Sequence, residues 1–577
     1  MRNKIRVYGL IVTACILILS ITGCAGVPAG NTDPTPGPSQ SPAASNEPGE
    51  SGNPGESQAP PAPGPAQPAY RPVIEEELSE AALDAWLDFK IKVADNTNPS
   101  FLRDFIRSSF SVVPPEAADA MVWQYINILR DYLDTMNRYL LGDDIREALL
   151  NAYQSDGTFD SSMLDEGQNN FVDETEAREI GWVVLEGMIE PRIRYDRIAE
   201  WTGPVSPMMG EYVDLLAEDV SDPPAVDGAL QIGYQALEER TLRIEELLGS
   251  AIGSPYQSDV EDLYVRYLDL FLSGADTPSV LDIDRYYESD ILAMNPEAEA
   301  AFQQVLDTRP DSATAAAVAD WWGYLSGLIE SGASGETVYQ QIWDGFFTRL
   351  DEYAAAAGVR VPRLFFTVST DEIDDDIFKA KIEYPLFYGE GVPDGALSKV
   401  ENWITADIQK GRDEVRDMSA PDHDLAADDG YELPPYGFYA NLRLAQEAGP
   451  VASVVADMEQ YTGGAHGMPY RIGYNFDPMT GEQVAIADLF QEGADPWALL
   501  GEDITRQITL LQERYSETGG DTGYLPYNEY AGLSEPHEWY VTDEGITVIF
   551  QAYEIGPYAM GLPEFTVPWW RLADYLK

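Results

Sequence analysis

The chain has 577 residues and carries 99 acidic against 35 basic side chains, so its formal net charge is −64 and its length allows two or three domains. A field of that sign repels phosphate backbones and anionic lipid headgroups, which argues against nucleic-acid binding and against a peripheral contact with an anionic membrane surface. The charge favours cationic partners, while solubility or adaptation to a salty or acidic habitat would produce the same excess of carboxylates.

The N-terminus has the order of a targeting segment. Arg2, Lys4 and Arg6 precede an apolar run over 10–19, and small residues lead to Cys24. This resembles a bacterial lipoprotein signal with its lipobox, which implies a signal peptide over 1–23, a lipid on Cys24 and a protein held outside the cytoplasm on the cell membrane. An ordinary secretory signal or an uncleaved anchor is the alternative, but the apolar run is short for a span of about 20 residues.

Cleavage would change both the charge and the thiol content. Residues 1–23 contain three basic and no acidic side chains, so the mature chain would carry −67. The other cysteine, Cys15, would be removed as well. We therefore expect neither a disulfide nor a cysteine-based metal site.

Residues 24–73 are rich in Pro, Gly and Ser, with almost no bulky apolar side chain. Such a segment cannot bury enough apolar surface to offset the entropy lost on ordering. We expect a disordered tether that holds the folded part away from the membrane.

From 74 to 358 the apolar residues recur at helical spacing. One such stripe joins Leu83, Trp86, Leu87 and Ile91, and another is expected over 180–193. Pro and Gly clusters separate the stripes. The pattern predicts a mostly α-helical domain whose function the sequence does not indicate.

From 359 to 577 the period changes to two. Strands are expected over 361–369, 378–388, 437–444, 451–460, 470–476, 538–541, 546–552 and 565–567, and helices over 397–415 and 496–515. Short connections join most of them. The whole chain is therefore expected to be multidomain, with a C-terminal α+β domain of an antiparallel sheet and two helices.

Two stretches of this domain hold the candidate ligand contacts. The first is Tyr461-Thr462-Gly463-Gly464-Ala465-His466-Gly467, with Tyr461, Thr462, Gly463, Gly464, His466 and Gly467 as candidates; the second supplies Tyr553, Glu554 and Tyr558. Glycines permit a sharp turn, and we favour a structural hydrogen bond from His466 to the backbone over a ligand contact. Glu554 lies among aromatic residues, so it is either a structural anchor or a contact for a cationic partner.

Five motifs in order resemble a known module. They are the 461–467 stretch, Tyr474-Asn475-Phe476-Asp477 with Gly481, Asp488-Leu489-Phe490, the segments 540–545 and 550–559, and Pro563 to Pro568. Together they resemble the extracytoplasmic domain of RsiV-type anti-sigma factors, which also occurs beside the catalytic domain of PdaC-type peptidoglycan deacetylases. The resemblance covers about residues 376–577 and implies a module that binds lysozyme outside the cell. A lipid in place of a membrane span leaves no support for direct inhibition of a sigma factor.

Catalysis finds little support in the residues. There is no GxSxG or HExxH motif, and His423, His466 and His537 are too far apart for the metal-binding pattern of a deacetylase. We expect no metal and no cofactor. A glycosidase needs only two carboxylates, which so acidic a chain cannot exclude.

The sequence thus predicts an envelope lipoprotein that binds without catalysis. The expected ligand is a cationic protein such as lysozyme, or a wall polymer. The alternative is a peptidoglycan-modifying enzyme whose active site lies in the helical domain or at the domain interface.

Overall fold

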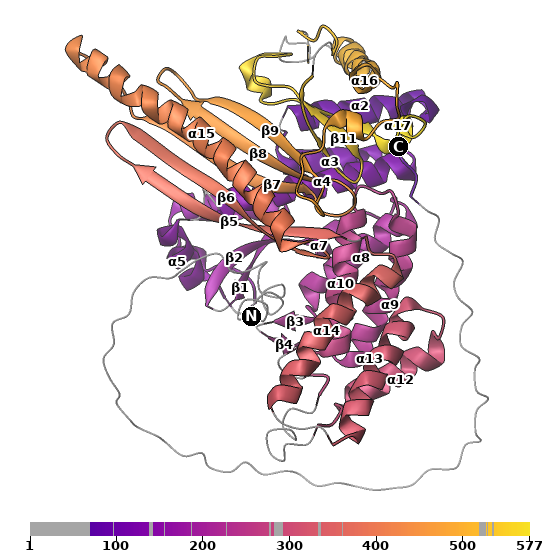
Figure 1. Ribbon diagram of the computed structural model, residues 1–577. Coiled ribbons are helices and arrows are strands. Elements are labelled where there is room, and N and C mark those ends of the chain that lie inside the picture. Colours follow the sequence, from indigo (N-terminus) through magenta and orange to yellow (C-terminus); the bar gives the residue numbers. More distant parts are fainter. Residues whose placement is uncertain are drawn as a thin grey trace, which may run out of the picture. The chain divides into compact units, whose positions relative to one another are not determined.

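The computed structural model describes residues 70–577 apart from 96, 138–141, 155, 186, 227, 276–278, 282–291, 333–335, 361, 519–526, 528 and 534–535. Cys24, the expected signal peptide and nearly all of the expected tether lie outside the described residues. Within them, a mostly helical region is followed by an α+β region, so the expected fold class is confirmed (Figure 1). None of the helices in the described ranges is long and apolar enough to cross a membrane.

Serine caps begin several helices of the first region. The hydroxyls of Ser79, Ser206 and Ser312 each accept a hydrogen bond from the backbone N–H three residues later, which satisfies a donor that has no partner inside the helix. The described helices of this region are α2 (Glu80–Ala94), α3 (Pro99–Ser109), α4 (Pro115–Thr135), α5 (Asp143–Ala152), α6 (Glu166–Ala177), α7 (Tyr195–Ala199), α8 (Pro207–Ser221), α9 (Tyr234–Ala251), α10 (Gln257–Ser273), α12 (Pro296–Thr308), α13 (Ala313–Glu330) and α14 (Glu336–Ala357).

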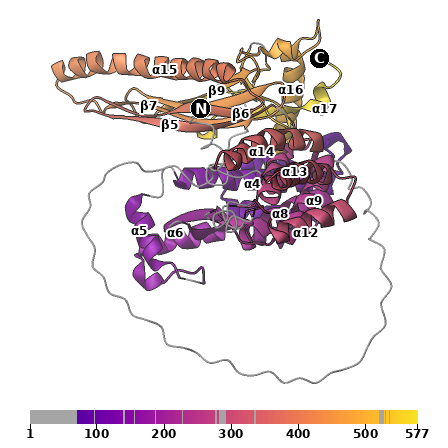
Figure 2. The same ribbon diagram turned by 60° about the horizontal axis from the view of Figure 1, so that its bottom comes forward.

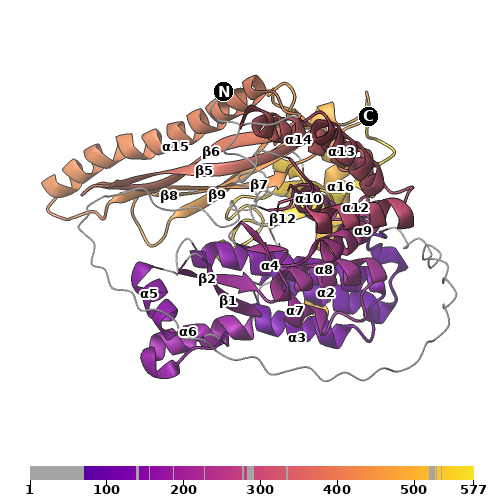
Figure 3. The same ribbon diagram turned by 90° about the horizontal axis from the view of Figure 1, so that it is seen from below.

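The helix expected over 180–193 is wrong. This segment forms an antiparallel hairpin of β1 (Ile180–Leu185) and β2 (Met188–Ile193), and the helices α5 and α6 pack against it (Figure 3). Gly187 has φ of +81° in the tight connection, which only glycine adopts without strain. The β-branched residues and Trp182 favour a strand, and this preference prevails over the helical spacing. A second short hairpin joins β3 (Ala225–Val226) to β4 (Ala229–Leu230).

A five-stranded sheet forms the first half of the α+β region. Its spatial order is β5 (Arg363–Asp374), β6 (Phe378–Glu390), β7 (Tyr436–Gln446), β8 (Ala452–Tyr461) and β9 (Met468–Phe476). Neighbours are antiparallel except β6 and β7, which are parallel because α15 (Asp394–Asp428) crosses over between them. Figure 2 shows α15 along one face of the sheet, where Val400, Ile404 and Ile408 are buried.

A three-stranded antiparallel sheet forms the second half. It comprises β10 (Glu538–Val541), β11 (Gly545–Ile549) and β12 (Glu564–Pro568), with α16 (Pro496–Thr518) packed beside it and the short α17 (Trp569–Leu572) after it. The sequence placed α2 in the helical domain, but its Leu87 shares a core with this sheet and α16. Arg514 of α16 also pairs with Asp88 of α2 at 2.8 Å, so the first described helix packs against the last third of the chain.

The two sheets approach each other closely at β9 and β10. A Cβ on Gly473 would lie 2.0 Å from the carbonyl oxygen of Trp539, so only glycine fits there. Next to it, the amide of Asn475 donates to that same carbonyl at 2.7 Å, and Ser453 donates to the Asn475 oxygen at 2.6 Å. Side-chain hydrogen bonds thus hold the second sheet against β8 and β9.

Two arginines, one partly exposed and one fully buried, connect the helical and α+β regions. Arg363 is fully buried and donates to Glu261 at 2.8 Å, to Glu447 at 2.6 Å and to Asp262. Arg360 donates to Glu261 at 2.8 Å and to Asp543 at 2.5 Å. We call these six residues the arginine junction: Arg360, Arg363, Glu261, Asp262, Glu447 and Asp543.

Removing the buried guanidinium should be costly. We expect Arg363→Met to lower the free energy of unfolding by about 3–5 kcal/mol, because it removes a fully buried guanidinium and leaves the Glu261 carboxylate, 1% exposed, with one guanidinium, that of Arg360, in place of two. Chemical denaturation measures the loss. The matched control is Lys379→Met, since Lys379 forms an exposed pair with Asp374 worth less than about 1 kcal/mol. A loss no larger than that of the control would contradict the prediction.

Candidate functional site

The 461–467 stretch forms the end of the β8–β9 hairpin. The last pair of the ladder joins Gln460 to Met468, and Gly463 and Gly464 have φ of +93° and +100° in the loop between them. The hydroxyl of Tyr461 donates to the Gly464 carbonyl at 3.1 Å. Thr462 is exposed at the tip. The two glycines are therefore explained by backbone conformation alone.

His466 has one ring nitrogen committed to the backbone. Its Nδ1 lies 2.8 Å from the Gly467 carbonyl oxygen, which can only accept, so Nδ1 carries the proton. In the neutral ring this leaves Nε2 as an acceptor, and the Tyr553 hydroxyl approaches it at 3.4 Å. The expected structural hydrogen bond exists, while the other edge of the ring faces a second candidate residue.

The loop after β11 brings the second stretch onto this hairpin. Tyr558 stacks on His466 with ring centroids 4.0 Å apart, and its hydroxyl donates to the Gly467 carbonyl at 3.1 Å. The Tyr553 ring lies 5.5 Å from that of Tyr558. We call His466, Tyr553 and Tyr558 the aromatic patch. Its members His466 and Tyr553 are 87 residues apart in the sequence.

Tyr553 combines backbone strain with exposure. Its φ is +69°, and among the described residues the only other non-glycine positions with positive φ are Glu179 and Tyr527. A bulky residue in this region costs roughly 1–3 kcal/mol and persists only where surrounding contacts hold it. The residue is nevertheless 47% exposed. The fold thus keeps an aromatic ring in a strained position at the surface, a combination that concentrates at functional sites.

Glu554 supports the turn that carries Tyr553. One carboxylate oxygen accepts from the Gln551 N–H at 2.7 Å, and the other lies 2.6 Å from Nε2 of His537. Its side chain is 34% exposed, so these bonds leave part of the carboxylate facing solvent. Glu554 therefore makes the bonds of a structural anchor, and its exposed part can still meet a cationic partner, so the two expected roles do not exclude each other. Its partner His537 is 17 positions away, and no local spacing in the sequence indicates the contact.

Gln551 fixes the turn to the edge of β9. Its side-chain oxygen accepts from the Arg471 N–H at 3.0 Å, and its amide donates to the Arg471 carbonyl at 2.8 Å. The side chain thus takes the place of a neighbouring strand. No local spacing reveals this contact, because the two residues are 80 positions apart.

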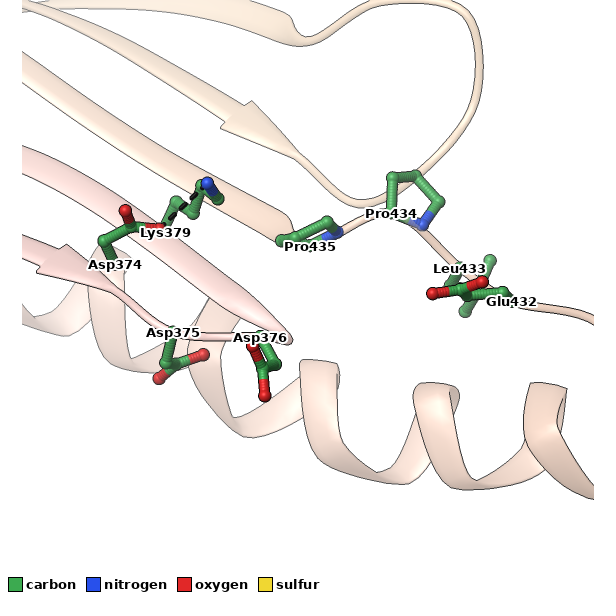
Figure 4. Close-up of a pocket in the computed structure, with 8 residues that line it drawn as sticks. All are labelled: Asp374, Asp375, Asp376, Lys379, Glu432, Leu433, Pro434 and Pro435. Carbon is green, nitrogen blue, oxygen red and sulfur yellow. Dashed lines mark ion pairs between the residues drawn. The ribbon is translucent and has the colours of Figure 1, made fainter.

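The aromatic patch lies outside the two hollows described next. A hollow of about 670 Å³ lies at the tip of the β5–β6 hairpin (Figure 4), where Asp374 pairs with Lys379 at 2.8 Å. Another, of about 370 Å³, lies between α15 and the strands β8 and β9. The residues lining these two hollows do not include the aromatic patch: Asp374, Asp375, Asp376, Lys379, Glu432, Leu433, Pro434 and Pro435 in the first, and Asp407, Lys410, Gly411, Glu414, Met458, Gln460, Tyr470 and Ile472 in the second. In the described part of the chain, no three His, Cys, Asp or Glu side chains are grouped to hold a metal ion.

Two family models match segments of the α+β region. The family model described as "Deacetylase PdaC" matches residues 372–469, and the one described as "Protein of unknown function (DUF3298)" matches residues 487–570. His466 thus lies in the first matched segment, and Tyr553 and Tyr558 in the second. A search of curated proteins found no match.

Two solved structures of DUF3298 proteins are similar to part of the chain. One, from Bacteroides fragilis, is 15% identical with a TM-score of 0.29, and the match covers 38% of this chain and 94% of the Bacteroides chain. The other, from Pseudomonas aeruginosa, is 16% identical with a TM-score of 0.25, and the match covers 37% of this chain and 94% of the Pseudomonas chain.

The strain at Tyr553 can be separated from its exposed ring. We expect Tyr553→Gly to leave the midpoint of thermal unfolding unchanged or raised, because glycine adopts positive φ freely and little buried surface is lost. Tyr558→Ala should instead lower the free energy of unfolding by about 1–3 kcal/mol, since it removes a ring stack and a hydrogen bond. Chemical denaturation compares the two variants. A larger loss of free energy of unfolding in Tyr553→Gly than in Tyr558→Ala would contradict this assignment.

Proposed function

We propose that this protein is a cell-envelope lipoprotein whose RsiV-like C-terminal module binds a ligand through the aromatic patch, without catalysis. The ligand is a cationic envelope-directed protein such as lysozyme; a wall polymer is the other candidate. The observation that carries the proposal is the strained, 47% exposed Tyr553 beside His466 and Tyr558.

Aromatic rings at a surface suit such a partner. Tyrosine presents a large contact area with little side-chain entropy to lose, and it is enriched at the centres of protein interfaces. The glutamate next to Tyr553 provides a carboxylate at the rim of the patch. A cationic side chain can contact both the aromatic faces and this carboxylate.

The charge of the chain supports a cationic partner as well. At −64 over the whole sequence, long-range attraction speeds encounter with a positively charged protein and weakens as salt screens it. The resemblance to RsiV-type domains and the match to the PdaC family model favour a place in the bacterial envelope.

Binding to lysozyme tests the proposal. We expect the full chain to bind lysozyme saturably at low ionic strength and less tightly as salt rises, as measured by isothermal titration calorimetry. Tyr553→Gly should weaken binding at least tenfold, because it removes the exposed ring of the patch without cost to the fold. Tyr439→Ala is the matched control, since it removes another exposed tyrosine, on β7. The absence of saturable binding even at low salt would rule out lysozyme as the ligand.

The alternative is an envelope enzyme that modifies peptidoglycan, with its active site in the helical domain or at the domain interface. The family model that matches residues 372–469 describes a deacetylase, which supports this alternative. Incubating the full chain with wall fragments and following their masses distinguishes the two functions. Turnover of the fragments would defeat the binding proposal, whereas binding to the fragments without mass change would make the wall polymer the ligand.

The membrane anchor is a separate part of the proposal. It rests on the lipobox-like sequence that ends in Cys24. We expect the chain expressed in a bacterial host to be recovered in the membrane fraction. The Cys24→Ala variant should be neither processed nor labelled with lipid. Incorporation of radiolabelled fatty acid measures this, and equal labelling of both chains would contradict it.

A further inference from the structure

The arginine junction places two carboxylates on one nitrogen. Asp262, on α10, and Glu447, just after β7, both accept from Nη2 of Arg363. Each carboxylate lies within hydrogen-bonding distance of the same atom, so the two accepting oxygens are about 5 Å apart or less. The two residues come from the helical and the α+β regions, and they meet on a side chain with no solvent exposure.

The local charges do not balance when all groups are ionised. Four carboxylates of the junction face two guanidinium groups, and Asp259, paired with Arg130 of α4 at 2.5 Å, lies on the same helix. The charged and titratable groups that face the pair are Asp259 and Glu261 of α10, Arg360 and Arg363 at the start of β5, and Asp543 between β10 and β11. Two neighbouring carboxylates in such surroundings ionise together only at a cost, so they tend to share a proton.

The pKa shifts follow this geometry. Burial, and next the nearby Asp262 carboxylate, raise the pKa of Glu447 well above its usual range, although the Arg363 charge acts in the opposite direction. The shift is strongest at Glu447, because Asp262 keeps 47% of its side chain in contact with solvent. Burial also acts to raise the pKa of Asp543, but its hydrogen bonds and attraction to Arg360 outweigh this and hold it below its usual value. The excess proton therefore belongs to the pair Asp262 and Glu447.

We propose that Asp262 and Glu447 form a proton-dependent latch between α10 and the β7–β8 connection. The latch is closed while the pair holds one proton on Arg363, and it opens when both carboxylates are ionised. The Asp262 side chain can leave Arg363 and turn into solvent, because it is 47% exposed. The Glu261 side chain cannot, because it is only 1% exposed. This inference is independent of the proposed ligand.

Loss of the Asp262 bond to Arg363 would weaken the support of a defined set of backbone contacts beside it. The Leu364 N–H donates to the Glu447 carbonyl at 2.7 Å, and the Gly449 N–H approaches the Pro362 carbonyl at 3.4 Å. Both hold the start of β5 against the connection that leads into β8. The far end of β8 carries Tyr461 and the hairpin of the aromatic patch, so the latch acts on the strand that positions this hairpin.

Hydrogen–deuterium exchange of the full chain, followed by mass spectrometry from pH 5 to pH 8, tests the latch. The closed state binds more protons than the open state, so its stability falls as pH rises above the usual carboxyl range. After correction for intrinsic exchange, we expect peptides covering 362–366 and 445–451 to lose about tenfold or more of their protection by pH 8, which corresponds to a difference of one pKa unit. Peptides from the interior of α9 should keep theirs.

Glu447→Gln keeps an acceptor for Arg363 but cannot ionise. We expect this variant to retain, from pH 5 to pH 8, the protection that the wild type shows at pH 5. The matched control is Glu432→Gln, which replaces an exposed glutamate of the α+β region and should behave as the wild type. Asp262→Asn provides a second test should Glu447→Gln show altered circular dichroism at pH 5. Protection that does not change with pH in the wild type, or that falls equally in the wild type and the non-ionising variant, would overturn the proposal.

Discussion

The burial of Arg363 is the constraint on which the arrangement of this protein depends. A guanidinium with no solvent exposure must find acceptors for its donors, since an unpaired buried charge costs several kcal/mol. Its acceptors come from α10 and from the β7–β8 connection, and Arg360 adds the turn between β10 and β11. Segments almost 300 positions apart in the chain are thereby fixed around one side chain and its neighbour.

Strand β8 connects the arginine junction to the aromatic patch. β8 begins next to the junction and ends at the hairpin that carries His466. Beside it, Ser453 and Asn475 hold the second sheet through the backbone of Trp539 and Val541. Because the turn with Tyr553 and Tyr558 follows β11 of that sheet, the two halves of the patch can meet only when both joints are formed. The site is thus a product of the sheet packing and not of either loop alone.

The sequence predicted the elements better than the contacts between them. Period-two patterns located the strands of both sheets within a few residues, and the expected multidomain class was correct, because each depends on local hydrophobic spacing. The β1–β2 hairpin was missed because its apolar residues also fit a helical stripe. The partners His537 and Gln551, and the buried position of Arg363, carry no local signal, since each depends on residues that only the tertiary fold brings near.

The strained backbone of Tyr553 is the feature of the aromatic patch that points to a binding role. A tyrosine with positive φ would relax if its turn were free, but Gln551 and Glu554 hold both the backbone and the edge of β9 in place. These hydrogen bonds do not involve the ring, and the residue as a whole remains 47% exposed. A purely structural turn would be satisfied by glycine or asparagine at this position. The presence of a large aromatic side chain here, at a conformational cost, is therefore better explained by contact with a partner than by the needs of folding.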